Sequence, residues 1–297
     1  MIGEIRRSQL VSTFGVGAII NTRDLSVMVA GIDDWPIGQM ETINERRLQK
    51  KLGVYKFRQP KAVQKQAKKK VDSIPCVRFP LFVYCPKCHR LGKFKELTGD
   101  ANATICRSCE AEHGNEASVI PSRFVTVCRN GHIDDFPWQY WINCNCKNPK
   151  LSLEMSSESS SLAGIRVKCL NRDCNNVGRT MQDAFLSREW RGYKCTKNRP
   201  WLGDIDDFDC AQPISVMQRG ATSVHFSVTE SAISIPPYSS KAYATVQSHI
   251  YRSVKSWPDS IEKDEKTFKN FEEEYGVPSS ALVAAYQHIH AEENGRE

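Results

Sequence analysis

Cysteine is the residue type with the clearest chemical potential in this sequence, which holds twelve cysteines, all between residues 76 and 210. Two CxxC pairs, Cys85 with Cys88 and Cys106 with Cys109, are separated by 17 residues. Two such pairs can bring four thiolates to one tetrahedral Zn²⁺, at roughly 2.3 Å per sulfur. The spacing is typical of a zinc ribbon and predicts a first zinc site. A redox motif is less favoured, because the flanking sequence lacks the βαβ pattern of thioredoxin-like proteins.

The other candidate ligands are spaced less regularly and suggest two further sites. The second set joins a CxxxH motif to a CxC motif: Cys128, His132, Cys144 and Cys146. The third set joins a CxxxxC motif to two distant cysteines: Cys169, Cys174, Cys195 and Cys210. Eleven cysteines and one histidine thus form three sets of four, with Cys76 left over. The sequence leaves open an exchange of ligands between the second and third sets, and His132 could instead only cap a turn.

All three sets offer four protein ligands, whereas a catalytic zinc usually has three and an open position. The sequence also lacks a Walker A motif, an HExxH motif and the combination of HxE followed by PCxxC that is typical of base deaminases. We therefore expect two to three structural zinc ions and a protein that is not an enzyme. The alternative is a metal-dependent nuclease or hydrolase with an active site that these motifs do not describe.

Positive charge is concentrated in one segment of a chain whose net charge is +7. Residues 45–72 contain eleven lysines and arginines against two acidic residues. Lysine is a flexible point charge that suits phosphates better than base edges, so the segment predicts sequence-independent contact with DNA. The predicted contact residues are Arg46, Arg47, Lys50, Lys51, Lys65, Lys68, Lys69 and Lys70. A solvated linker is the other interpretation.

The elements around these residues predict an α+β fold: an irregular, zinc-stabilised chain of several modules with zinc-ribbon-like elements, short β-sheets and a C-terminal helical segment. Residues 1–75 are expected to form a β-rich N-terminal segment with a basic helix at 46–52 that ends at Gly53. Residues 76–212 form the zinc-binding region, which includes a flexible serine-rich loop at 156–161. Residues 213–297 form a strand region, with a strand at 223–228, followed by helices. The last helix is expected to begin at Ser279 or Ser280, after a break at 276–278.

No stretch approaches 18 consecutive apolar residues, and the N-terminus has no apolar signal-peptide core. We therefore expect a cytoplasmic protein with no membrane contact. A reducing cytoplasm favours metal binding over six disulfides.

Several stretches outside the metal ligands occur in a characteristic order. They are Arg6–Val11, Phe14–Ala18, Ala30–Pro36, Arg78–Pro80, Cys128–Trp138, Arg199–Gly203, Gln218–Ala221 and Ser231–Pro236. Together they resemble the DrmB family of the DISARM anti-phage defence system, over residues 1 to about 260. Members of that family are usually much longer, so we expect this chain to be an N-terminal portion, the product of a split gene or a short variant.

The resemblance implies a partner. DrmB-like proteins work beside a DrmA-like helicase that carries the ATPase, and the complex engages invading DNA. DISARM also includes a methyltransferase that marks host DNA. The resemblance therefore implies a zinc-binding accessory subunit that docks the helicase and contacts DNA. Two apolar sets are candidate docking surfaces, with core packing as the alternative for both: Leu282, Tyr286 and Ile289 of the last helix, and the stretch Phe136–Trp141.

Overall fold

The computed structural model describes residues 5–22, 25–36, 38, 40–43, 45–60, 74–100, 103–114, 117–157, 159–175, 177–233 and 238–294. The chain divides into two compact units. The first unit consists of Met1–Gln39 and Pro60–Thr229, and the second of Met40–Gln59 and Glu230–Glu297. This division differs from the three predicted segments at 1–75, 76–212 and 213–297. Strand pairing explains the difference, because strands from all three predicted segments pair with one another inside the first unit.

The largest sheet of the first unit has six antiparallel strands in the order β13-β12-β11-β7-β6-β8. The strands are β6 (Phe82–Tyr84), β7 (Arg90–Lys93), β8 (Ile120–Pro121), β11 (Leu151–Met155), β12 (Ile165–Cys169) and β13 (Arg179–Thr180). The hairpin of β11 and β12 places buried Leu153 opposite buried Val167, which fixes its register. The helices α3 (Phe94–Thr98) and α4 (Arg107–His113) lie between β7 and β8 in the chain.

Two three-stranded antiparallel sheets complete the framework of the first unit. One has the order β1-β2-β5, with β1 (Ile19–Asn21), β2 (Ser26–Val29) and β5 (Cys76–Arg78). The other has the order β10-β9-β16, with β9 (Phe124–Cys128), β10 (Ile133–Asp135) and β16 (Ile214–Gln218). The shorter elements are α1 (Gln9–Ser12), η1 (Ile32–Asp34), α5 (Trp138–Trp141), η3 (Leu162–Gly164), η4 (Ser187–Trp190), β14 (Asn198–Arg199) and β15 (Asp204–Ile205).

An aromatic core organises the first unit. Phe136, Trp138 and Trp141 are at most 1% exposed. Trp190 stacks on Trp141 with ring centroids 5.4 Å apart. Burial of such rings is a large part of the stability of a domain of this size. The stretch 136–141 was a candidate docking surface, and that prediction is wrong because the core covers its large side chains; only Tyr140 is substantially exposed.

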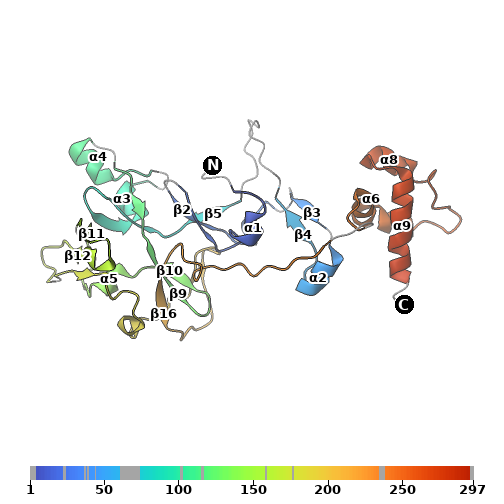
Figure 1. Cartoon of the computed structure of the whole chain (residues 1–297). Helices are drawn as coiled ribbons and strands as arrows, with labels where there is room; N and C mark the ends of the chain where they lie inside the picture. The colour runs from blue at the N-terminus through green and yellow to red at the C-terminus, as the bar shows by residue number, and fades with distance from the viewer. Residues whose placement is uncertain are drawn as a thin grey trace. The chain divides into compact units, whose positions relative to one another are not determined.

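The second unit combines a β-hairpin with helices. Its elements are β3 (Glu41–Ile43), α2 (Arg46–Leu52), β4 (Phe57–Gln59), α6 (Lys241–Thr245), the π-helix η5 (Val246–Ile250), α7 (Tyr251–Lys255), α8 (Lys269–Tyr275) and α9 (Ser279–Asn294). Figure 1 shows α9 as the long red helix beside α6 and α8. Leu282, Tyr286 and Ile289 of α9 are at most 2% exposed and belong to this core. They are therefore not a docking surface either.

Local signals in the sequence predicted some of these elements and missed others. The helix at 46–52 is confirmed, and Gly53 ends it with a φ of 65°. The last helix begins at Ser279, after α8 has ended at Gly276. The predicted strand at 223–228 is wrong, since that segment pairs with no strand among the described residues. The helices that follow this segment begin at Lys241.

The α+β class, the short antiparallel sheets and the C-terminal helices are confirmed. Within the described part of the chain, no helix combines the length and apolar character that crossing a bilayer requires.

Candidate metal centres

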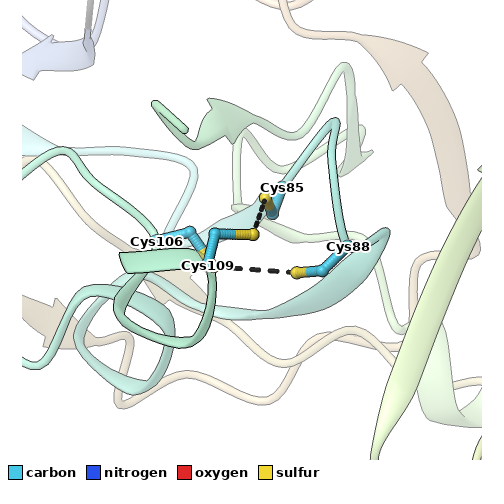
Figure 2. Close-up of side chains that lie close together, drawn as sticks. All are labelled: Cys85, Cys88, Cys106 and Cys109. Carbon is cyan, nitrogen blue, oxygen red and sulfur yellow. Dashed lines mark hydrogen bonds between the residues drawn. The ribbon is translucent and has the colours of Figure 1, made fainter. Parts of the chain in front are cut away.

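The first cluster is built on one hairpin and one helix start (Figure 2). Cys85 directly follows β6 and Cys88 lies in the turn that leads to β7. Cys106 is the N-cap of α4, and Cys109 lies in the first turn of that helix. The second CxxC pair is therefore a helix N-terminus, where the helix dipole favours thiolate.

The sulfur positions of this cluster fit one tetrahedral ion. Cys85 Sγ lies 3.6 Å from Cys109 Sγ, and Cys88 Sγ lies 3.7 Å from Cys106 Sγ. A tetrahedron with arms of roughly 2.3 Å has edges of roughly 3.8 Å. Disulfides would require about 2.05 Å between sulfurs. The arrangement can therefore hold a metal ion such as zinc.

Hydrogen bonds and burial shift the pKa values of the thiols in this cluster in opposite directions. Burial acts to raise the pKa of Cys85, but backbone N–H groups of Cys88 and Lys87 donate to its sulfur and bring that pKa below its ordinary value. Burial raises the pKa of Cys88 and, with neighbouring sulfurs, that of Cys109. Four thiolates cannot share this buried space without a cation, which the same geometry can supply.

The second cluster joins distant parts of the chain: Cys128, His132, Cys195 and Cys210. His132 Nδ1 lies 3.4 Å from Cys128 Sγ and 3.5 Å from Cys195 Sγ. Cys128 Sγ lies 3.8 Å from Cys210 Sγ. With arms of roughly 2.3 Å to sulfur and 2.0–2.1 Å to nitrogen, a tetrahedral ion needs sulfur–nitrogen edges of roughly 3.5 Å. The distances fit a site with three sulfurs and one nitrogen.

The other ring nitrogen of His132 is held by a carboxylate. His132 Nε2 lies 3.0 Å from an oxygen of Asp206, and Arg199 in turn lies 3.5 Å from the second oxygen of Asp206. The hydrogen bond from His132 lowers the pKa of Asp206 and keeps it charged. A carboxylate behind a histidine ligand fixes the ring tautomer and increases ligand basicity. Asp206 was not predicted from the sequence; its signal is the run of aspartates that precedes Cys210.

Two further features shape the thiols of the second cluster. Burial raises the pKa of Cys195 to about 12. For Cys210, burial acts in the same direction, but the backbone N–H of Gln212 and the side chain of His132 lower its pKa to about 7. Asn130 also donates its amide to Cys210 Sγ over 3.3 Å. The cluster therefore combines the readily ionised thiol of Cys210 with that of Cys195, whose proton a bound cation would displace.

The third cluster is local: Cys144, Cys146, Cys169 and Cys174. Cys144 Sγ lies 3.7 Å from Cys174 Sγ, and Cys169 Sγ lies 4.0 Å from Cys146 Sγ. The loop with the first two cysteines is fixed by Gln139, whose amide donates to the carbonyls of Cys144 and Cys146. Burial raises the pKa of Cys144 to about 12. This cluster can also hold one tetrahedral ion.

The structure corrects how the second and third sets were divided. Cys144 and Cys146 were grouped with His132, whereas they lie with Cys169 and Cys174. The β11–β12 hairpin places Leu151 opposite Cys169, which brings Cys169 next to the CxC loop. Pairing of β16 with β9 places Ile214 opposite Cys128 and brings Cys210 to the second cluster. All twelve predicted ligands thus fall into three clusters of four, and Cys76 belongs to none of those found among the described residues.

The predicted DNA-binding residues divide into two groups. Lys65, Lys68, Lys69 and Lys70 lie outside the described residues. The remaining four lie on α2, where three engage other groups of the second unit: Arg46 pairs with Glu292 at 3.6 Å, the Arg47 guanidinium lies 5.6 Å from the ring centre of Tyr238, and Lys51 pairs with Glu230. Lys50 is exposed. These contacts favour a structural role for most of the positive charge on α2.

The fold and its clusters define a class: a multi-module α+β protein organised around three sets of four cysteine or histidine side chains. Residues 6–226 match a family described as a domain of unknown function, DUF8724, and the chain belongs to that family. It is also 30% identical, over 226 residues, to the DISARM protein DrmB of Bacillus paralicheniformis. That similarity covers 73% of this chain but 37% of the relative, so the chain spans well under half of the relative's length. The resemblance to DrmB is thereby confirmed.

Proposed function

We propose that the protein is a non-catalytic zinc-binding accessory subunit of a DISARM-type anti-phage complex, which docks a DrmA-like helicase and contacts DNA without sequence preference. The observation that carries this proposal is the set of three four-ligand clusters in a chain homologous to DrmB. Four protein ligands leave a tetrahedral ion no open position, so zinc in these clusters would stabilise structure and not activate water. We place this complex in the cytoplasm, where it would meet invading DNA.

Zinc is the ion that best fits the donor sets. Eleven thiols and one imidazole are soft or borderline ligands, and tetrahedral sulfur-rich sites select zinc over calcium or magnesium. The cysteines of the first and third clusters belong to the apolar cores of the first unit or pack against them. Zinc would therefore add its binding free energy to apolar burial in stabilising the short elements that carry these ligands.

One exposed apolar segment supports helicase docking. Phe226 is 78% exposed and Val228 is 89% exposed. They lie two residues apart in a segment that forms no helix or strand, so one partner can contact both side chains. Exposed aromatic and aliphatic side chains of this kind commonly become the buried centre of a protein interface. We assign this segment to the helicase contact, in place of the two buried sets considered from the sequence.

Co-purification with the helicase of the same defence system tests the proposal. The wild-type chain should associate with it, and a Phe226→Ser, Val228→Ser double variant should associate at least about tenfold more weakly, because interface anchors of this type commonly contribute more than 1 kcal/mol each. Val177→Ser is the matched control, since Val177 is also exposed, at 82%. Equal association of both variants would remove the segment from the interface. No association of the wild-type chain at any salt concentration would refute the docking role.

The purified chain should also hydrolyse neither ATP nor DNA in the presence of Mg²⁺ or Mn²⁺. Turnover of either substrate that disappears in a cluster variant would instead favour a metal-dependent nuclease or hydrolase.

A further inference from the structure

A hollow of about 340 Å³ lies in the first unit beside the second cluster. Its volume falls in the range of roughly 300–1,000 Å³ that is common for ligand pockets. Its walls come from four distant parts of the chain, around Gly17, Arg129, Trp201 and His225. Three of these parts belong to the stretches that carry the resemblance to DrmB: Phe14–Ala18, Cys128–Trp138 and Arg199–Gly203. The metal clusters alone do not explain why stretches so far apart in sequence meet here.

Two aromatic rings border the hollow where Gly17 lies. A Cβ atom on Gly17 would lie 3.7 Å from a ring carbon of Trp201 and 3.9 Å from a ring carbon of His225. Gly17 has a φ of 81°, a conformation that suits glycine, and it leaves the space between its backbone and these rings unfilled. His225 is fixed in place, because its Nε2 lies 3.2 Å from the carbonyl oxygen of Val16. Trp201 and His225 therefore contribute aromatic side chains to the wall, and the contact with Val16 restrains His225.

Arg129 is the one lysine or arginine among the described residues that line the hollow. Arg129 lies at its wall, is exposed to solvent, and forms no ion pair with the described residues. None of the described residues that line the hollow is acidic. No Asp or Glu of the lining would repel an anion at Arg129, and zinc in the second cluster would offset much of the negative charge of Cys128, which also lines the hollow. The apolar side chains of Val224 and Ile133 in the lining disfavour a fully hydrated ion.

We propose that this hollow binds one unpaired nucleotide of a DNA strand, with the base against the rings of Trp201 and His225 and a phosphate at Arg129. A nucleotide is the common ligand that combines a flat apolar face with a negative charge, and bases stack on aromatic side chains with little sequence preference. The inference rests on the DNA contact proposed above and deepens it, because it assigns that contact to a site and to single-stranded DNA. Cys128 and His132 also line the hollow, so zinc in the second cluster would fix its shape.

Two variants of the full, zinc-loaded chain test the site. Arg129→Glu reverses the charge at the wall, and Ser223→Phe fills the hollow from an exposed position. The matched control is Arg172→Glu, which makes the same charge change at an exposed arginine between two cysteines of the third cluster. Zinc content and melting temperature are measured for each variant, so that a folding defect is recognised. The probe is a fluorescent single-stranded oligothymidine, compared with the same strand carrying abasic positions, with duplex DNA and with free thymidine monophosphate.

The proposal predicts that both hollow variants bind the single strand about tenfold more weakly than the wild type, while Arg172→Glu does not. Abasic positions should weaken wild-type binding and leave the hollow variants nearly unaffected. Equal binding by all variants would overturn the site and leave the DNA contact elsewhere in the chain. Binding of the free monophosphate but not the strand would overturn the strand as occupant. Absence of any DNA binding by the wild-type chain would refute the proposed DNA contact itself.

Discussion

The grouping of ligands into clusters makes a sharp prediction for two double variants. Cys144→Ser with Cys169→Ser removes two ligands from the third cluster. Cys169→Ser with Cys195→Ser removes one ligand from the third cluster and one from the second. Both variants delete two thiols, so they differ only in how those thiols are distributed. The sequence-based grouping predicts the reverse distribution, because it places Cys169 with Cys195 and apart from Cys144.

The expected effect follows from the share of one ligand in a closed site. Structural zinc contributes about 10–16 kcal/mol of apparent free energy, so one of four ligands accounts for about 3 kcal/mol, or a roughly hundredfold weaker site. Among the described residues the third cluster contains four candidate ligands, so it holds no fifth donor that could replace Cys144 or Cys169. A site with even one ligand missing should therefore lose its ion to a moderate chelator.

Native mass spectrometry after dialysis against such a chelator is the assay. The wild-type chain should retain three zinc ions, the Cys144 and Cys169 variant two, and the Cys169 and Cys195 variant one. The opposite order of the two variants would refute the grouping derived from the structure. Equal loss in both would show that the second and third clusters do not bind metal independently.

Three further predictions concern other parts of the molecule. Asp206→Asn should weaken metal binding at the second cluster alone by about 10–100-fold, because it removes the carboxylate that holds the His132 ring. Chelator competition measures this loss, and the control Asp207→Asn, at an exposed neighbouring aspartate, should have no effect. Burial raises the pKa of Asp135 from 3.8 to about 6, so its carboxyl favours the folded state at low pH and that contribution is lost as the pH rises through about 6. Asp135→Asn should thus gain stability relative to the wild type between about pH 4 and about pH 6 in thermal melts, and a constant difference would contradict the assignment. Finally, DNA binding can be tested with a variant in which Lys65, Lys68, Lys69 and Lys70 are all replaced by glutamate. Its DNA affinity should fall equally for all sequences, and the salt dependence of binding should flatten by roughly the number of phosphates that the variant no longer neutralises. Unchanged binding at low salt would identify the segment as a solvated linker.

The sequence predicted those features that depend on neighbouring residues. The first cluster needs one hairpin turn and one helix start, and each CxxC pair encodes its own turn. Gly53 likewise ends α2 through a local backbone conformation. Ten of the twelve ligands were predictable for the same reason, because they occur in short-spaced motifs, whereas Cys195 and Cys210 were assigned by completing a third set of four.

Features that depend on long-range pairing were not predictable in this way. The second cluster exists because β16 pairs with β9, which joins Cys128 to Cys210 across a separation of 82 residues, and no local pattern records that pairing. The alternating apolar residues of β11 and β12 would have allowed one long-range contact to be predicted. They indicate two strands, and pairing of these strands in a hairpin brings Cys169 close to Cys146. The segment 223–228 shows the converse error: its alternation suits a strand, but it has no partner strand within the described part of the chain.

Cadmium NMR of the full chain tests the three-cluster assignment most directly, because the ¹¹³Cd chemical shift reports the ligands of each ion. The zinc ions are exchanged for ¹¹³Cd and the spectrum is recorded on the folded protein. We expect three resonances of equal intensity: two from sites with four sulfur ligands and a third that is shifted because one of its ligands is nitrogen. The His132→Ala variant should lose this third resonance. Fewer than three resonances, or three that all report sulfur-only coordination, would contradict the assignment.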